Sequence, residues 1–129
     1  MTDELLDELC RARAARRPCA RVTVAATKGS VPRGAGAKML VYADDLTSGT
    51  IGGGKFEALV VTAARTCLRS KETLLKTFPL RENEPDSFGA ICGGESTVLI
   101  EPQLLREALF LVGAGHCARA IARLALECG

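Results

Sequence analysis

Three consecutive glycines, Gly52-Gly53-Gly54, mark the point at which the hydrophobic pattern of this chain changes its period. Before them, polar and small apolar residues alternate over Ala20–Thr27, which is the two-residue period of a strand with one buried face. After them, apolar residues recur from Phe56 to about Ser70 at the spacing of an amphipathic helix. The chain therefore combines strands and a helix within one unit, which indicates an α/β fold.

Further elements follow from the same kind of pattern. An N-terminal helix with one apolar face ends before Pro18, because proline cannot continue a helix. Four more strands are predicted at Lys38–Tyr42, Ser48–Ile51, Thr73–Phe78 and Ser96–Glu101. Pro102 closes this part of the chain, so we expect residues 1–102 to form one α/β domain with a mixed sheet.

The remaining residues, 103–129, contain a different pattern. Leu109–Val112 is wholly apolar, as is typical of a strand buried on both faces of a parallel sheet. Gly113-x-Gly115 and a predicted helix over Cys117–Glu127 follow it, which is the strand, turn and helix order of a dinucleotide-binding fold. We therefore expect the start of a Rossmann-like domain. Since a lone strand needs partners, this unit must pack on the first domain, pair with another copy or belong to a longer parent.

Composition narrows the possible partners. The 129 residues carry a formal net charge of only +2, which gives no reason to expect nucleic acid or an anionic membrane as partner. The longest apolar runs are far too short to cross a bilayer, and the acidic N-terminus is unlike a signal peptide. We expect a cytoplasmic protein.

Six cysteines, at positions 10, 19, 67, 92, 117 and 128, include no Cys-x-x-Cys pair. In a reducing cytosol such scattered cysteines are better interpreted as free thiols than as a disulfide framework. The one histidine, His116, has no cluster of further ligands around it in the sequence, so we expect no structural zinc site.

Two glycine-rich segments are candidate anion sites. The segment Lys28–Lys38 interleaves three glycines with Lys28, Ser30 and Arg33, and backbone amides together with cations can hold an anion. The turn Gly52–Gly54 enters a helix, whose N-terminus attracts negative charge. The alternative for Lys28–Lys38 is an ordinary mobile loop, and the alternative for Gly52–Gly54 is a tight strand-to-helix connection. Glu57 in the first helical turn would repel an anion if it faced the same way.

A third segment, Cys92-Gly93-Gly94, places a thiol beside two residues without side chains. That arrangement leaves the sulfur open to a ligand, and a thiolate suits a soft or sulfur-ligated metal centre. The alternative is a buried structural cysteine, the commonest fate of a free one, and the other five cysteines fit that alternative better.

Together these segments resemble the XdhC/CoxI family. Four runs occur in the order typical of the family: Val24–Arg33, Gly36–Val41, Gly49–Gly54 and Cys92–Glu95. In addition, Leu109–His116 looks like the start of that family's Rossmann-like second domain.

The resemblance implies an accessory protein rather than an enzyme. Members bind the molybdenum cofactor, support its sulfuration with a cysteine desulfurase, and deliver it to apo xanthine dehydrogenase or a related molybdenum hydroxylase. Carried over to this sequence, the candidate cofactor-binding residues are Lys28, Ser30, Arg33, Gly52, Gly53, Gly54, Cys92, Gly93, Gly94, Gly113 and Gly115. Lys28 or Arg33 with the glycine-turn amides would hold the molybdopterin phosphate, and Cys92 would contact molybdenum.

Two other functions stay open. Gly113-x-Gly115 suggests a fragment of an NAD(P)-binding oxidoreductase, although the chain has no second strand, acidic ribose ligand or acid–base residue to complete one. The chain is otherwise a non-catalytic interaction module, a homodimer whose copies are bridged by the final strand and helix. A hydrolase of the Ser/His/Asp type is not expected, because His116 has no nucleophile partner in the sequence.

Overall fold

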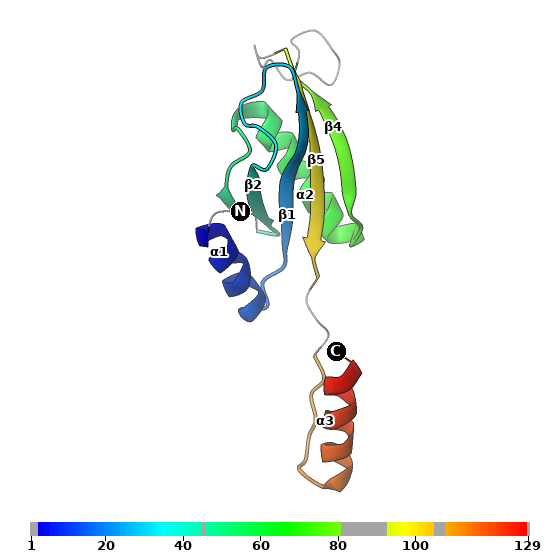
Figure 1. The fold of residues 1–129 in the computed structure, drawn as a ribbon. Coiled ribbons are helices and arrows are strands. Elements are labelled where there is room, and N and C mark those ends of the chain that lie inside the picture. The colour runs from blue at the N-terminus through cyan, green and yellow to red at the C-terminus, as the bar shows by residue number, and fades with distance from the viewer. Residues whose placement is uncertain (1–2, 45, 81–92, 105–107, 129) are drawn as a thin grey trace.

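The computed structural model describes residues 3–44, 46–80, 93–104 and 108–128 (Figure 1). Within them the elements follow the predicted order and fall close to the predicted bounds. They are α1 (Asp3–Ala14), β1 (Cys19–Lys28), β2 (Lys38–Tyr42), β3 (Thr47–Gly49), α2 (Gly54–Ser70), β4 (Leu74–Pro79), β5 (Glu95–Gln103) and α3 (His116–Cys128).

The five strands form one sheet in the order β3-β2-β1-β5-β4, and the α/β class is confirmed. All named strands pair antiparallel, including β1 and β5, which are far apart in the sequence. The mixed pairing predicted for the sheet is limited, among the described residues, to a single parallel bridge between Ser30 and Gly93.

Helix α2 covers one face of the sheet and connects the β3 edge with the β4 edge (Figure 1). Its buried residues Phe56 and Val60 pack into the main core with alternate residues of the strands, such as Val22 and Val98. The rings of Phe56 and Phe78 meet edge to face with centroids 5.9 Å apart. Burying each large side chain contributes about 1.5–3 kcal/mol, so this layer holds the fold together.

Helix α1 covers the opposite face, beside β3, β2 and the first residues of β1. Successive side chains of a strand point to opposite faces, so Leu40 and Tyr42 face α1 and pack against Leu5 and Leu9. The Tyr42 hydroxyl donates a hydrogen bond to Glu8 at 2.8 Å. Burial, followed by this bond to a carboxylate, raises the pKa of Tyr42 to about 12. The α1 contact is therefore specific as well as apolar.

The segment Leu109–Val112 is not a strand in the structure, contrary to the prediction, and its side chains are exposed. A strand needs a neighbouring strand for its backbone hydrogen bonds, and no strand of the described residues pairs with this one. Helix α3 does form as predicted, but it stands apart from the sheet with Ile121 and Leu124 exposed (Figure 1). Although this surface is apolar, none of the described helices has the length and apolar character needed to span a membrane.

Candidate functional site

The loop after β1 meets the start of β5 at one end of the sheet (Figure 1). The two strands are antiparallel, so Lys28 at the end of β1 pairs with Glu95 at the start of β5. Next to this pair, a Cβ atom on Gly94 would overlap the Ser30 carbonyl oxygen and lie 2.7 Å from the Lys28 carbonyl oxygen. Only glycine permits this approach, so Gly94 fixes the Lys28–Ser30 segment against β5.

The same loop also reaches the turn before α2. A Cβ atom on Gly52 would lie 2.7 Å from the Cβ atom of Pro32, so these two segments are in close contact as well. The structure thus brings together the three predicted glycine segments, which are far apart in the sequence. We call Lys28–Arg33, Gly52–Gly54 and Gly93–Gly94 the glycine cluster.

Three glycines of the glycine cluster have free space on the side where a side chain would stand. No atom of the described residues lies within 4 Å of where a Cβ atom would stand on Gly53, Gly54 or Gly93. The Lys28 and Arg33 side chains are exposed beside this backbone, in the same loop as Ser30. Two exposed cations beside backbone that carries no side chains are suited to a polar ligand with an anionic group.

The turn before α2 is hydrogen-bonded to the carboxylate of Glu57, which the sequence indicated only as a charge that would repel an anion. Oε2 of Glu57 accepts hydrogen bonds from the Thr50 hydroxyl (2.6 Å), the Gly53 amide (3.0 Å) and the Ile51 amide (3.1 Å). Burial raises the pKa of the Glu57 carboxyl, but these hydrogen bonds outweigh it and hold the pKa below its ordinary value. Glu57 therefore faces the turn as a carboxylate and uses amides that an external anion would need.

Gly113 and Gly115 do not join the glycine cluster. They follow β5, whose first residue adjoins Gly94 and whose nine residues lead to the other end of the sheet (Figure 1). A strand advances about 3.3 Å per residue, so the length of β5 separates the two places. Cys92, the predicted molybdenum contact, lies outside the described residues and precedes Gly93 in the sequence.

The five described cysteines are free thiols in two different environments. Cys19 and Cys67 are buried, as expected, and burial raises the pKa of both thiols. The other three are exposed, contrary to the prediction that they are structural core residues: Cys10, Cys117 and Cys128. Cys10 lies off the apolar face of α1, and α3 has no face packed on the sheet.

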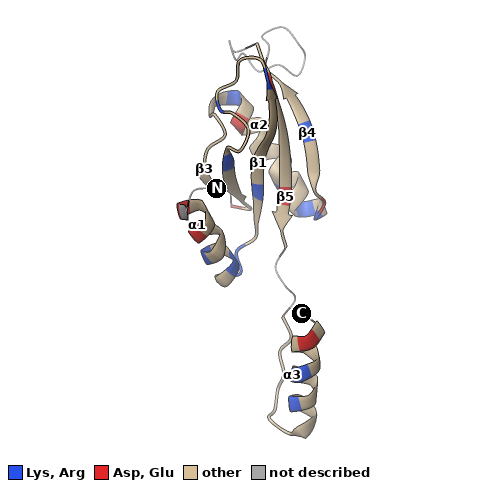
Figure 2. Ribbon diagram, in the orientation of Figure 1, with Lys and Arg blue, Asp and Glu red and all other residues tan. Residues whose placement is uncertain are grey.

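His, Cys, Asp and Glu residues in the described part of the chain form no group of three or more that could hold a metal ion. His116 begins α3, away from the glycine cluster. Charged residues of both signs occur on α1, on α2 and on the strands rather than on one face (Figure 2). On the sheet, for example, Arg21 and Glu101 form an ion pair at 2.8 Å.

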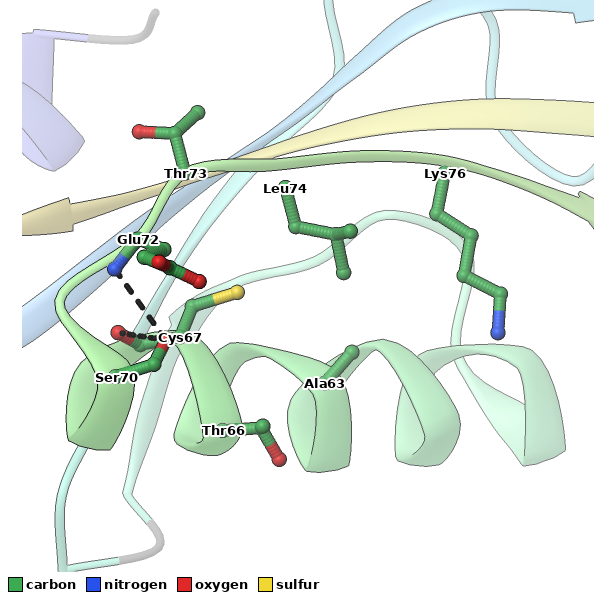
Figure 3. A pocket seen from close by; sticks show the side chains of 8 residues that line it. All are labelled: Ala63, Thr66, Cys67, Ser70, Glu72, Thr73, Leu74 and Lys76. Carbon is green, nitrogen blue, oxygen red and sulfur yellow. Dashed lines mark hydrogen bonds between the residues drawn. The ribbon is translucent and has the colours of Figure 1, made fainter.

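A groove of about 280 Å³ lies between the C-terminal half of α2 and β4 (Figure 3). The sequence did not indicate it, because its walls come from a helix and an edge strand with no shared motif. The Ser70 hydroxyl donates to the Cys67 carbonyl and accepts from the Glu72 amide (Figure 3). Burial raises the pKa of the Cys67 thiol, which is therefore not an activated nucleophile. The groove lies at the opposite end of α2 from the glycine cluster.

Comparisons with known proteins agree with this arrangement. The model of the XdhC and CoxI family matches residues 12–79, which include two of the three glycine segments. The protein YqeB of Escherichia coli K12, described as uncharacterized, is 38% identical over 112 residues, which cover 87% of this chain and 20% of YqeB.

A crystal structure of a xanthine dehydrogenase from Bacillus halodurans is similar in fold, with a TM-score of 0.64 and 28% identity. The similarity covers 74% of this chain and 29% of that one. The chain thus spans less than a third of either relative. Because the family model matches more than half of the 129 residues, and its match spans both the β1 loop and the turn before α2, the chain belongs to the XdhC and CoxI family.

Proposed function

We propose that this chain acts as an accessory protein of a xanthine dehydrogenase-type molybdoenzyme, and that its glycine cluster binds the molybdenum cofactor. Family membership and the similarity to the Bacillus halodurans xanthine dehydrogenase support the association. The observation that carries the proposal is the convergence of three glycine segments, with open backbone and the exposed cations Lys28 and Arg33, at one end of the sheet.

The residues present fit the chemistry of this cargo. Molybdopterin carries a phosphate, which the Lys28 ammonium and the Arg33 guanidinium can bind by charge-assisted hydrogen bonds. The open backbone at Gly53, Gly54 and Gly93 leaves space for the bulky pterin to approach. In this proposal the Cys92 thiol, next in sequence to Gly93, is the contact for molybdenum.

The partners follow from the same proposal. A cysteine desulfurase supplies sulfur to the bound cofactor, and the apo form of a xanthine dehydrogenase or related hydroxylase receives it, all in the cytoplasm. The chain itself performs no catalytic step.

The other two functions fare differently. A homodimer is compatible with the proposal, because the exposed Leu109–Val112 segment and α3 offer apolar surface to a second copy. An NAD(P)-binding role is not favoured, because the strand before Gly113 is not formed and Gly113 and Gly115 stand away from the glycine cluster.

Anaerobic binding of molybdenum cofactor to the purified chain tests the proposal. Arg33→Ala should weaken binding by about tenfold or more, because a hydrogen bond between charged groups contributes about 1.5–3 kcal/mol. Arg13→Ala, which removes another exposed cation, on α1, should leave the affinity unchanged. Cys92→Ala tests the molybdenum contact separately. Equal affinities in wild type, Arg33→Ala and Cys92→Ala would remove the glycine cluster as the cofactor site.

A further inference from the structure

The turn between β3 and α2 has the geometry of an anion site that is already occupied from within. The amides of Ile51 and Gly53 donate to the same oxygen, and Gly52, which lies between them, has a positive φ of 134° that favours glycine. The Thr50 hydroxyl points there too, and all three groups donate to the single oxygen Oε2 of Glu57. We call these three donors the amide nest.

The amide nest adjoins the N-terminus of α2, which begins at Gly54. The N-terminus of a helix carries about half a positive charge, and free amides there attract phosphate and carboxylate groups. With Glu57 in the nest, a second anion must displace the carboxylate or bind against its charge. The charged form of Glu57 is the favoured one in the folded protein, so this repulsion persists at neutral pH.

We propose that Glu57 determines the ligand specificity of the glycine cluster, by excluding anionic groups from the N-terminus of α2 and directing them to the Lys28–Arg33 loop. The loop is close enough for this selection to act on one ligand, because Pro32 contacts Gly52. Around Gly52–Gly54 the cluster then accepts an uncharged or hydrogen-bond-donating part of the ligand. The identity of that ligand rests on the function proposed above, whereas the exclusion of anions does not.

Inorganic phosphate is the probe, and the backbone amide signals of Ile51 and Gly53 in a ¹H–¹⁵N NMR spectrum report where it binds. Three chains are compared with wild type at pH 7. Glu57→Ala empties the amide nest, Glu57→Gln keeps the side chain but removes its charge, and Glu72→Gln removes an exposed carboxylate at the other end of α2. Circular dichroism checks that each variant folds.

We expect phosphate to shift the two amide signals most strongly in Glu57→Ala and more weakly in Glu57→Gln. The apparent affinity in Glu57→Ala should exceed that of wild type by about two- to fivefold, the effect of a charge at a helix N-terminus. Glu72→Gln should behave as wild type. The proposal is overturned if phosphate shifts these amides equally in wild type and in the Glu57 variants, or in none of them. Should Glu57→Ala not fold, Glu57→Gln and wild type still decide the result.

This experiment is separate from the test of cofactor binding. Loss of cofactor binding in Arg33→Ala with no phosphate effect at Glu57 would sink the specificity proposal alone. Conversely, cofactor binding that is unchanged in Arg33→Ala, together with a phosphate effect in the Glu57 variants, would keep Glu57 as an anion-excluding residue. It would remove the molybdenum cofactor as the ligand.

Discussion

The chain contains two units with the same local pattern, a short strand-like segment, a glycine turn and an amphipathic helix. In the first, β3 and Gly52–Gly54 lead into α2, which is packed across the sheet. In the second, Leu109–Val112 and Gly113–Gly115 lead into α3, which exposes its apolar residues. Similar local patterns thus give a packed unit in the middle of the sequence and an unpacked one in its last part.

The difference shows that helix formation is determined within the segment itself, whereas strand formation depends on a neighbouring strand. Both helices form where their periodicity predicts them, because the hydrogen bonds of a helix lie within its own segment. The strand-like segments differ, because β3 has β2 as a neighbour and Leu109–Val112 has none among the described residues. Pairing alone does not bury a segment, because Thr47 and Gly49 of β3 are exposed although β3 is paired, and Leu109–Val112 is exposed throughout.

The largest expected effect is a difference in the free energy of unfolding between substitutions in α2 and in α3. Phe56→Ala removes a ring of α2 that is 3% exposed, and should lower the free energy of unfolding by about 3–5 kcal/mol. Leu124→Ala removes an apolar side chain of α3 that is 61% exposed, and should change it by less than about 0.5 kcal/mol. Urea unfolding followed by circular dichroism measures both. A loss in Leu124→Ala as large as that in Phe56→Ala would mean that α3 is packed in solution.

A smaller effect on the free energy of unfolding should distinguish alanine substitutions at two glycines, Gly94 and Gly115. Gly94→Ala forces a Cβ atom against the carbonyl oxygens of Lys28 and Ser30 and should cost about 1–3 kcal/mol. Gly115→Ala adds a Cβ atom with no described atom within 4 Å, and should be neutral in the same urea unfolding measurement. If Gly94→Ala proved as stable as wild type, the β1 loop would not be held against β5 as the structure shows.

Most of the fold was predictable because its signals are local. Alternation in β1, the helical spacing after Phe56 and the stop before Pro18 each fix one element. Strand pairing was not predictable in the same way. The sheet is antiparallel because of how the connections run, and no residue pattern within a strand specifies its neighbour. The exposure of Leu109–Val112 has the same cause, since an apolar run shows the need for a partner but not its presence.

The candidate site was predictable as separate segments, but not as one surface. Each glycine segment was visible alone, whereas the contacts of Gly94 with Ser30 and of Gly52 with Pro32 depend on the antiparallel end of the sheet. Glu57 was noticed only as a possible repulsive charge. Its direction depends on the backbone of the turn, where Gly52 with its positive φ lies between the two amides that donate to the carboxylate. Gly113 and Gly115 were included on a local motif whose strand does not form.

The smallest expected effect distinguishes the two turns by their response to pH. The first turn of α2 contains Glu57, whereas the first turn of α3 contains no acidic residue. The pKa of Glu57 is lowered in the folded chain, because its hydrogen bonds to Thr50, Ile51 and Gly53 outweigh the effect of burial. Its stabilising contribution is therefore complete above the unfolded-state pKa, about 4.3, and is lost as the pH falls through the lower folded-state pKa.

Urea unfolding of wild type and Glu57→Gln at a series of pH values isolates this contribution. The difference in the free energy of unfolding should be constant near pH 7 and shrink below about pH 4.3, because wild type alone loses the Glu57 carboxylate. The carboxyl of Asp44, whose pKa Arg17 also lowers, is present in both chains and cancels from the difference. A difference that stays the same down to pH 3 would show that Glu57 does not act as a carboxylate in the turn, and the two glycine turns would then differ only in their packing.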